Sequence, residues 1–203
     1  MSVESQTVTG AKGAPLGRER VWNLPNNLSF VRIMAVPVVV WLLSRQEASS
    51  SLWAALVFGL AAATDMLDGY VARKSRQVTQ MGKLLDPLAD KLLVTGALIM
   101  LVPMGRVPAW AAFAIVAREM AVTGLRAAAA VRGYVIAASF AAKYKTAVQI
   151  AAALLLMLPE NLFGVGLHTP GLFALWVALA LALWSGLDYF TRFYKALSSE
   201  PLS

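Results

Sequence analysis

The chain has 203 residues, of which 59% are hydrophobic and 14% are charged, and its formal net charge is +7. A soluble domain of this length would be nearer half apolar and a quarter charged, so the composition argues against a water-soluble protein and favours an integral membrane protein. The chain contains no cysteine, which excludes disulfides and thiolate metal sites.

Six apolar segments follow one another along the chain. Each has about 20 residues, the length a helix needs to cross a hydrocarbon core of about 30 Å. Because backbone polar groups in lipid must be satisfied within the segment, each is expected to be a helix. The sequence therefore predicts an all-α integral membrane protein with six transmembrane helices and a polar active site on the cytoplasmic side. The expected spans are residues 28–45, 52–72, 87–104, 107–130, 146–164 and 171–195.

The polar ends of the chain flank this membrane domain, which is expected to cover residues 21–197. Residues 1–20 are expected to be disordered and residues 198–203 to form a short tail. Lysine and arginine gather in the loops on the side of both termini, whereas the opposite loops carry Arg45 and Arg106 and little else. The positive-inside rule then places both termini in the cytoplasm, with the protein in the plasma membrane. The basic residues are not interleaved with aromatic ones in a soluble module, so no nucleic-acid partner is expected.

Four of the eleven acidic residues flank the loop between the second and third expected spans. Asp65 and Asp68 share one face at the end of the second span. Asp86 is predicted to be the N-cap of the third span, with Pro87 at the first helical position and Asp90 one turn later. A short loop makes the two helices antiparallel neighbours, so all four carboxylates are expected to converge at the cytoplasmic membrane face.

Four converging acids in a low-dielectric site repel one another, so they need protons or a cation. The available ligands are all oxygens, which suits Mg²⁺ or Mn²⁺ rather than zinc. Four carboxylates can hold two ions, and sites with two metals commonly serve phosphoryl transfer. The simpler alternative is that Asp86 only caps a helix and the other three aspartates are solvated charges at the level of the head groups.

One stretch of the chain resembles the signature of the CDP-alcohol phosphotransferase family at every position. This stretch reads Asp65-x2-Asp68-Gly69-x2-Ala72-Arg73-x8-Gly82-x3-Asp86-x3-Asp90. The resemblance extends from about residue 22 to residue 195. "NLPNNLSFVR" resembles the family's segment before the first span, with Ser29 where threonine is usual. "AREMAVTGLR" and "KYKT" are similar to segments of the branch that uses glycerol phosphate.

The resemblance implies six spans, a homodimer in the membrane, and transfer of a phosphatidyl group from CDP-diacylglycerol to sn-glycerol 3-phosphate. It also implies that two ions, Mg²⁺ or Mn²⁺, bind among Asp65, Asp68, Asp86 and Asp90, and that Asp90 acts as the general base. Small residues would leave room for the nucleotide, and Arg73 can pair with a phosphate. The residues expected to bind CDP-diacylglycerol are Asn26, Ser29, Asp68, Gly69, Ala72, Arg73, Thr79 and Gly82.

A second group of cations is expected near the same membrane face. Arg118 and Arg126 fall in the fourth span, and Lys143 and Lys145 precede the fifth. Because the arginine fork suits phosphate, these four residues are predicted to bind the phosphate of the acceptor. The alternative is that Arg118 pairs with Glu119 and the others are ordinary residues of the cytoplasmic side.

Other functions remain open at this stage. Within the family, the acceptor could instead be phosphatidylglycerol, as in a cardiolipin synthase, or an inositol phosphate. From another class, a cation transporter would also use intramembrane aspartates, although it would carry them near the midplane on broken helices. A membrane scaffold gives no reason for the signature. Asp188 and Arg192, four residues apart, are predicted to form a structural ion pair.

Overall fold

The computed structural model describes residues 24–75, 80–131, 140–159, 161–162 and 164–198, and within them it describes the side chains except those of residues 24–26, 65–75, 80–87, 90, 140–143, 161–162 and 196–197. The described residues form six helices and one pair of short strands. The helices are α1 (Leu24–Ser44), α2 (Ala48–Ser75), α3 (Gln80–Leu101), α4 (Ala109–Val131), α5 (Phe140–Met157) and α6 (His168–Ser198). Strands β1 (Asn161–Leu162) and β2 (Val165–Gly166) pair antiparallel between α5 and α6. The prediction of an all-α fold is confirmed, with this small hairpin added to it.

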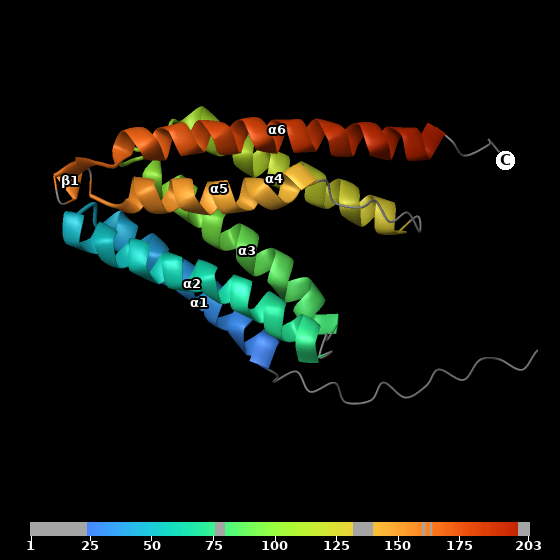
Figure 1. Ribbon diagram of the computed structural model, residues 1–203, viewed down its shortest axis with the longest axis horizontal. Helices are drawn as coiled ribbons and strands as arrows, with labels where there is room; N and C mark the ends of the chain where they lie inside the picture. Colours follow the sequence, from blue (N-terminus) through green and yellow to red (C-terminus); the bar gives the residue numbers. More distant parts are fainter. Residues whose placement is uncertain (1–23, 76–79, 132–139, 160, 163, 199–203) are drawn as a thin grey trace, which may run out of the picture.

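The helices run back and forth along the long axis of the molecule (Figure 1). Helix α1 packs along both α2 and α3, while α6 packs along α5 and α4. The two groups meet where α5 contacts α2 and α3 and where α3 contacts α4. The end of α2 and the start of α3 therefore lie at the end of the molecule opposite the β hairpin, as Figure 1 shows.

Among the side chains that the structure describes, the buried apolar ones form one core that extends over all six helices. Its largest fully buried apolar side chains are Val39, Leu43, Phe58, Leu98, Leu101, Ile115, Leu156, Met157 and Leu175. Alanines fill much of the remaining core, among them Ala54, Ala97, Ala111 and Ala152. Small side chains let helix backbones approach closely, as is common in membrane bundles.

Large apolar side chains also cover the outside of the bundle. Phe113, Met120, Phe173 and Trp184 are each more than 70% exposed, which is unusual for a soluble monomer. In the described part of the chain, two segments are long and apolar enough to cross a membrane, Asn27–Ser44 and His168–Lys195. Six helices are present as predicted, whereas six membrane crossings stay a prediction.

The start of α3 differs from the sequence-based expectation. The helix begins at Gln80, so Asp86 lies in its second turn and is not the N-cap. Most residues between Gln80 and Leu85 are good helix formers. Pro87 lacks the hydrogen bond that its own nitrogen would donate, and its ring crowds the carbonyl four residues earlier. The helix nevertheless continues through it from Gln80 to Leu101.

The fifth helix is also shifted. It covers Phe140–Met157 instead of residues 146–164. Leu158 precedes Pro159, and a residue before proline is disfavoured in the α region, so the chain turns into the hairpin there. Arg106 supports this end, because its Nη1 donates to the carbonyl oxygens of Met157 at 2.8 Å and Leu156 at 3.1 Å. These carbonyls have no partner within the helix, which gives this arginine a structural role.

Gly171, near the start of α6, allows α6 to approach α5 closely. A Cβ atom at this position would lie 2.9 Å from both Cγ and Cδ2 of the buried Leu156. Replacing Gly171 with alanine is expected to lower the free energy of unfolding by about 1–3 kcal/mol, because a packed core accommodates an added methyl group poorly. Thermal unfolding in detergent measures the change. Gly124→Ala is the matched control, because a Cβ there meets nothing within 4 Å and alanine favours a helix. Equal melting temperatures for the two variants would contradict the prediction.

Candidate functional site

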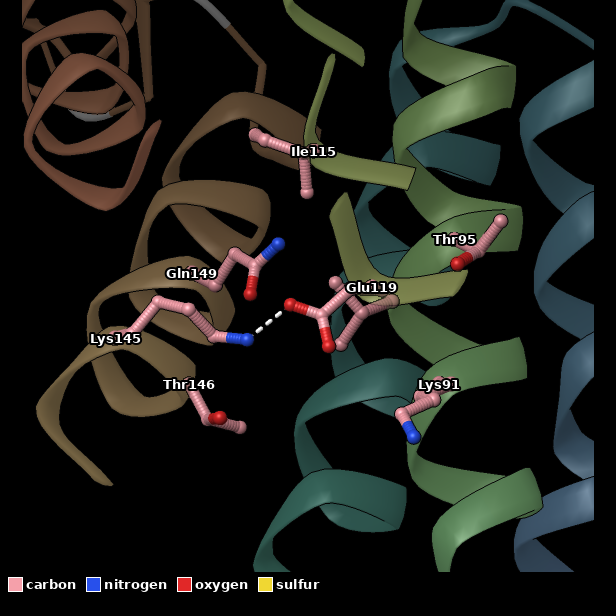
Figure 2. A pocket seen from close by; sticks show the side chains of 8 residues that line it. Lys91, Thr95, Ile115, Glu119, Lys145, Thr146 and Gln149 are labelled. Carbon is pink, nitrogen blue, oxygen red and sulfur yellow. Dashed lines mark hydrogen bonds and ion pairs between the residues drawn. The ribbon is translucent and has the colours of Figure 1, made fainter. Parts of the chain in front are cut away.

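A cluster of charged side chains joins α4, α5 and α6 inside the bundle. At its centre, Oε1 of Glu119 accepts a hydrogen bond from Nη1 of Arg118 at 3.0 Å and a second from Nζ of Lys145. The side chains of Lys145, Arg118 and Glu119 are only 5%, 9% and 16% exposed. Buried charges persist when they are paired and hydrogen-bonded, so the carboxylate holds both cations in place. Figure 2 shows its contact with Lys145.

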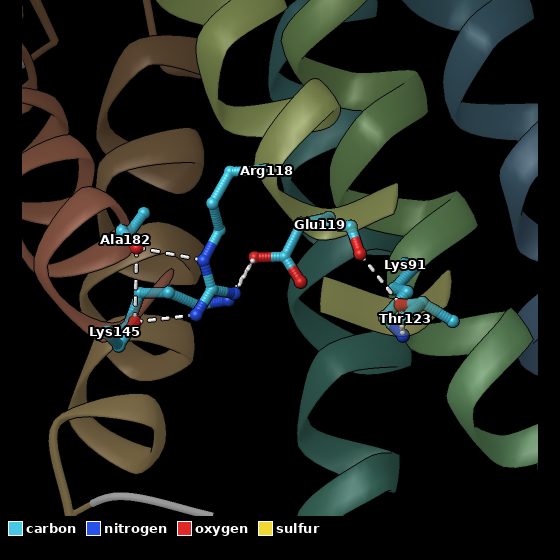
Figure 3. Close-up of polar contacts among 7 residues, drawn as sticks. Lys91, Arg118, Glu119, Thr123, Lys145 and Ala182 are labelled. Atoms are coloured by element: carbon cyan, nitrogen blue, oxygen red, sulfur yellow. Dashed lines mark hydrogen bonds and ion pairs between the residues drawn. The ribbon is translucent and has the colours of Figure 1, made fainter. Parts of the chain in front are cut away.

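Arg118 also ties α4 to α6. Its Nε donates to the carbonyl oxygen of Ala182 at 2.8 Å, and its Nη2 donates to Oγ of Ser185 at 2.6 Å. Gly186 leaves space for the arginine, since a Cβ atom there would lie 3.3 Å from Cγ of Arg118. Figure 3 shows the guanidinium between Glu119 and Ala182. Pairing with Glu119, which the sequence left as one alternative for Arg118, is therefore present.

Lys91 brings α3 into the same region. Its Nζ donates to Oγ1 of Thr123 at 2.6 Å, and that hydroxyl donates to the carbonyl oxygen of Glu119 at 2.7 Å. Lys91 directly follows Asp90 in α3. The cluster therefore begins next to the last aspartate of the signature.

Three cationic side chains of the described part of the chain, those of Lys91, Arg118 and Lys145, lie around the single carboxylate of Glu119. Lysine and arginine side chains are the usual protein donors to phosphate groups. Binding of the acceptor phosphate by this region stays a prediction.

A small pocket opens between α3, α4 and α5 beside this cluster (Figure 2). Its volume is about 20 Å³, room for about one water molecule. Any larger ligand requires side chains at the rim to move. The lining residues are Lys91, Val94, Thr95, Ile115, Glu119, Lys145, Thr146 and Gln149.

The structure brings together two of the four residues predicted to bind the acceptor phosphate, Arg118 and Lys145. Arg126 is exposed and lies two turns further along α4, with its guanidinium carbon 5.5 Å from the ring centre of Tyr189. The side chain of Lys143 in α5 lies outside the described residues. The role of all four in binding the acceptor stays a prediction.

Most residues predicted to bind CDP-diacylglycerol or metal ions lie outside the described side chains. Ser29 is an exception, since it is fully buried in α1, one turn before the buried Arg32. Thr79 lies outside the described residues, and so do the side chains of Asn26, Asp65, Asp68, Gly69, Ala72, Arg73, Gly82, Asp86 and Asp90. Among the described side chains, no group of three or more acids or histidines could hold a metal.

The backbone still bears on the metal prediction. Asp65 and Asp68 belong to α2, and Asp86 and Asp90 to α3. The ends of these helices lie beside each other (Figure 1). A set of carboxylate oxygens from two adjacent helix ends suits hard divalent cations, so the donor set fits such ions.

Sequence reasoning overlooked several residues of the cluster, notably Lys91, Gln149 and Ser185. Two signals were available. Lys91 follows the last signature aspartate, and Gln149 stands four residues after Lys145, which places both on one helix face. No comparable signal marked Ser185, because its contact with Arg118 depends on how α4 and α6 pack.

The predicted ion pair at the exposed end of α6 is confirmed. Nε of Arg192 lies 3.0 Å from Oδ1 of Asp188, and the two side chains are 54% and 31% exposed. This exposed pair lies outside the charged cluster, so substitutions in it are suitable controls for substitutions in the cluster.

Comparison with known proteins gives a consistent set of matches. A family model described as CDP-alcohol phosphatidyltransferase matches residues 22–184. A CDP-diacylglycerol–glycerol-3-phosphate 3-phosphatidyltransferase from Bacillus subtilis (strain 168) is 40% identical over 192 residues, covering 89% of this chain and 100% of the relative. A probable phosphatidylglycerophosphate synthase from Mycobacterium tuberculosis (strain ATCC 25618 / H37Rv) is 37% identical over 195 residues, covering 95% and 90%. A cardiolipin synthase (CMP-forming) from Streptomyces coelicolor is 39% identical over only 104 residues, covering 50% and 48%.

Proposed function

The chain belongs to the CDP-alcohol phosphatidyltransferase family, and we propose that it transfers the phosphatidyl group of CDP-diacylglycerol to sn-glycerol 3-phosphate. The products are phosphatidylglycerol phosphate and CMP. One observation carries this proposal: the similarity to enzymes named for this reaction covers nearly the whole chain, whereas the similarity to a cardiolipin synthase covers half of it. The cationic side chains of Lys91, Arg118 and Lys145 around Glu119 agree with a small phosphorylated acceptor.

The aspartates of the signature form the proposed reaction centre. Asp65, Asp68, Asp86 and Asp90 would hold two divalent cations, Mg²⁺ or Mn²⁺. Ions bound there would neutralise the diphosphate of the lipid substrate and the CMP leaving group. Asn26 and Ser29, which belong to the start of α1, would bind the same substrate together with the small residues of the signature.

The reaction is a displacement at the phosphorus atom on the lipid side of the diphosphate. Asp90 accepts the proton from the primary hydroxyl of the acceptor, and that oxygen bonds to the phosphorus. The bond from phosphorus to the oxygen of CMP breaks, and CMP leaves. Arg73 stabilises the negative charge that develops in the transition state. Arg118, Arg126, Lys143 and Lys145 hold the phosphate of the acceptor.

The proposed setting is the plasma membrane, with six crossings, cytoplasmic termini and a homodimer. The apolar side chains on the outside of the bundle support contact with lipid. The reaction centre then lies at the level of the cytoplasmic head groups, where the acyl chains of the substrate extend sideways into the bilayer. A soluble acceptor reaches the same site from the cytoplasm.

Incorporation of labelled acceptor by the purified protein, with CDP-diacylglycerol and Mg²⁺, tests the proposal. Glycerol 3-phosphate, an inositol phosphate and phosphatidylglycerol are compared side by side. Product from glycerol 3-phosphate alone supports the proposed reaction. Product from another acceptor alone would show that the proposed acceptor is wrong, while the family assignment would stand. Cation flux in liposomes without lipid substrate would favour a transporter.

Arg118→Ala is expected to raise the KM for glycerol 3-phosphate by about tenfold or more, since a hydrogen bond to a charged group contributes about 1.5–3 kcal/mol. The KM for CDP-diacylglycerol should change little. Steady-state kinetics with each substrate varied in turn measures both values. Arg192→Ala removes an arginine from an exposed pair and is the control. An unchanged KM for the acceptor would mean that Arg118 has only a structural role, in joining α4 to α6.

A further inference from the structure

Lys91 of α3 is a lysine without an acidic partner among the described side chains. The residue is half-buried, and its Nζ donates at 2.6 Å to the neutral hydroxyl of Thr123. An ammonium group has three donors, so two remain for a ligand. A charged residue in a membrane bundle that has no opposite charge beside it is a functional candidate.

Thr123 of α4 fixes the position of this ammonium group. Its hydroxyl proton is already used, because Oγ1 donates to the carbonyl oxygen of Glu119 at 2.7 Å. The same oxygen is therefore only an acceptor toward Nζ of Lys91 (Figure 3). A threonine has few side-chain rotamers in a helix, so the two bonds together determine where the end of the lysine lies. Thr123 thus holds Lys91 against α4 and leaves its charge in place.

Lys91 and Lys145 line the same small pocket from two different helices. Figure 2 shows Lys91 on α3 and Lys145 on α5, on either side of Glu119 in this view. The pocket has a volume of about 20 Å³, room for one water molecule, so a phosphate can bind only at its opening. Because Lys91 is half-buried, a ligand at the opening can reach its ammonium group. Lys91 also directly follows Asp90, the proposed base.

We infer that Lys91 donates a hydrogen bond to the phosphate of the acceptor, and that Thr123 is the positioning residue that holds Lys91 in place for this contact. Hydrogen bonds from ammonium groups to phosphate oxygens are among the strong ones. The four cations predicted from the sequence all belong to α4 and α5, whereas Lys91 belongs to α3, the helix that carries the proposed base. The inference rests on the proposed function and adds to its acceptor site a residue of this third helix.

The test separates binding of the phosphate from the chemical step. Lys91→Met removes the charge and nearly keeps the length of the side chain. The KM for glycerol 3-phosphate should rise by about tenfold or more, while kcat and the KM for CDP-diacylglycerol change little, as expected for a contact made equally before and during the reaction. Lys195→Met, at an exposed lysine in the last turn of α6, is the matched control.

Propyl phosphate provides a readout that does not depend on the chemical step. It has the phosphate but no hydroxyl that can react, so it should inhibit the wild-type protein in competition with glycerol 3-phosphate. Its inhibition constant should rise in Lys91→Met by about the same factor as the KM for glycerol 3-phosphate. A lower kcat with an unchanged inhibition constant would place Lys91 in the chemical step and overturn the inference.

Variants of Thr123 test the positioning role. Thr123→Val removes the hydroxyl at nearly constant volume and should raise the same KM and inhibition constant by about threefold or more, whereas Thr123→Ser keeps the hydroxyl and should restore both. Because Thr123 acts through Lys91, Lys91→Met combined with Thr123→Val should be no weaker than Lys91→Met alone. A full additional loss in the double variant would show that Thr123 does not act through Lys91.

Two further results would overturn the inference. If Lys91→Met left the KM for glycerol 3-phosphate and the inhibition constant unchanged, Lys91 would be an ordinary basic residue of the cytoplasmic side. If the wild-type protein did not use glycerol 3-phosphate at all, the proposed function would fail and this inference with it. Thermal unfolding in detergent shows whether Lys91→Met folds. If it does not, Lys91→Gln replaces it, because glutamine removes the charge and keeps a donor for Thr123.

Discussion

Replacing Asp90 with asparagine is expected to lower the turnover number by about two to four orders of magnitude, the contribution typical of a positioned general base. Asparagine has nearly the same shape but cannot accept the proton of the acceptor hydroxyl. Three further aspartates of the signature remain, so binding of CDP-diacylglycerol in the presence of Mg²⁺ should persist. The measurements are turnover with labelled glycerol 3-phosphate and, separately, retention of labelled CDP-diacylglycerol.

Asp188→Asn is the matched control for this experiment. It makes the same chemical change at an aspartate of the exposed pair with Arg192, which no proposed role in catalysis involves. Its turnover should equal that of the wild-type protein. If Asp90→Asn also turned over normally, the assignment of the base would be wrong, and a variant that lost lipid binding as well as turnover would point to a role in holding the substrate alone.

Replacing Glu119 with glutamine is expected to lower the free energy of unfolding by about 3 kcal/mol or more. The change removes the carboxylate that both Arg118 and Lys145 contact, and it leaves two largely buried cations side by side. Removing one partner of a buried ion pair typically costs about 3–5 kcal/mol, because the buried charge that remains loses its opposite charge. Thermal or denaturant unfolding in detergent measures the loss.

Two further variants separate this effect from a general sensitivity to mutation. Asp188→Asn breaks an exposed pair and should change stability by less than about 1 kcal/mol. Glu119→Gln combined with Lys145→Met removes one charge of each sign, so it should regain part of the stability that the single variant loses. A single variant as stable as the wild-type protein would show that the cations of the cluster are hydrated.

The end of α2 and the start of α3 illustrate how far the sequence alone leads. The spacing of the aspartates, glycines and arginine in the signature indicated the family, and the match over residues 22–184 confirms it. The prediction that Asp86 is an N-cap was wrong. It relied on the proline after this acid, which is typical of a helix start, whereas α3 begins six residues earlier, at Gln80. Local patterns predict that a helix exists more reliably than where it begins.

The charged cluster illustrates what depends on packing. The sequence placed Arg118 and Glu119 in the fourth span and Lys145 just before the fifth, and it left both a phosphate pocket and an ion pair open for Arg118. The structure shows that pair, and it adds contacts to Ala182 and Ser185 of α6. Those contacts join residues more than 60 positions apart, and no periodicity within one helix encodes them.

The sequence by itself determined the class of protein, the six helices and the family. Apolar segments long enough to cross a bilayer have few alternatives to helices, and a signature of fixed spacing lies within a single stretch of chain. Only the tertiary structure decided which cations share Glu119, that Gln149 lies in the same pocket, and that the pocket has room for a single small group. The physical reason is that these properties depend on the distance and rotation between α3, α4, α5 and α6, which the side chains of all four helices set together.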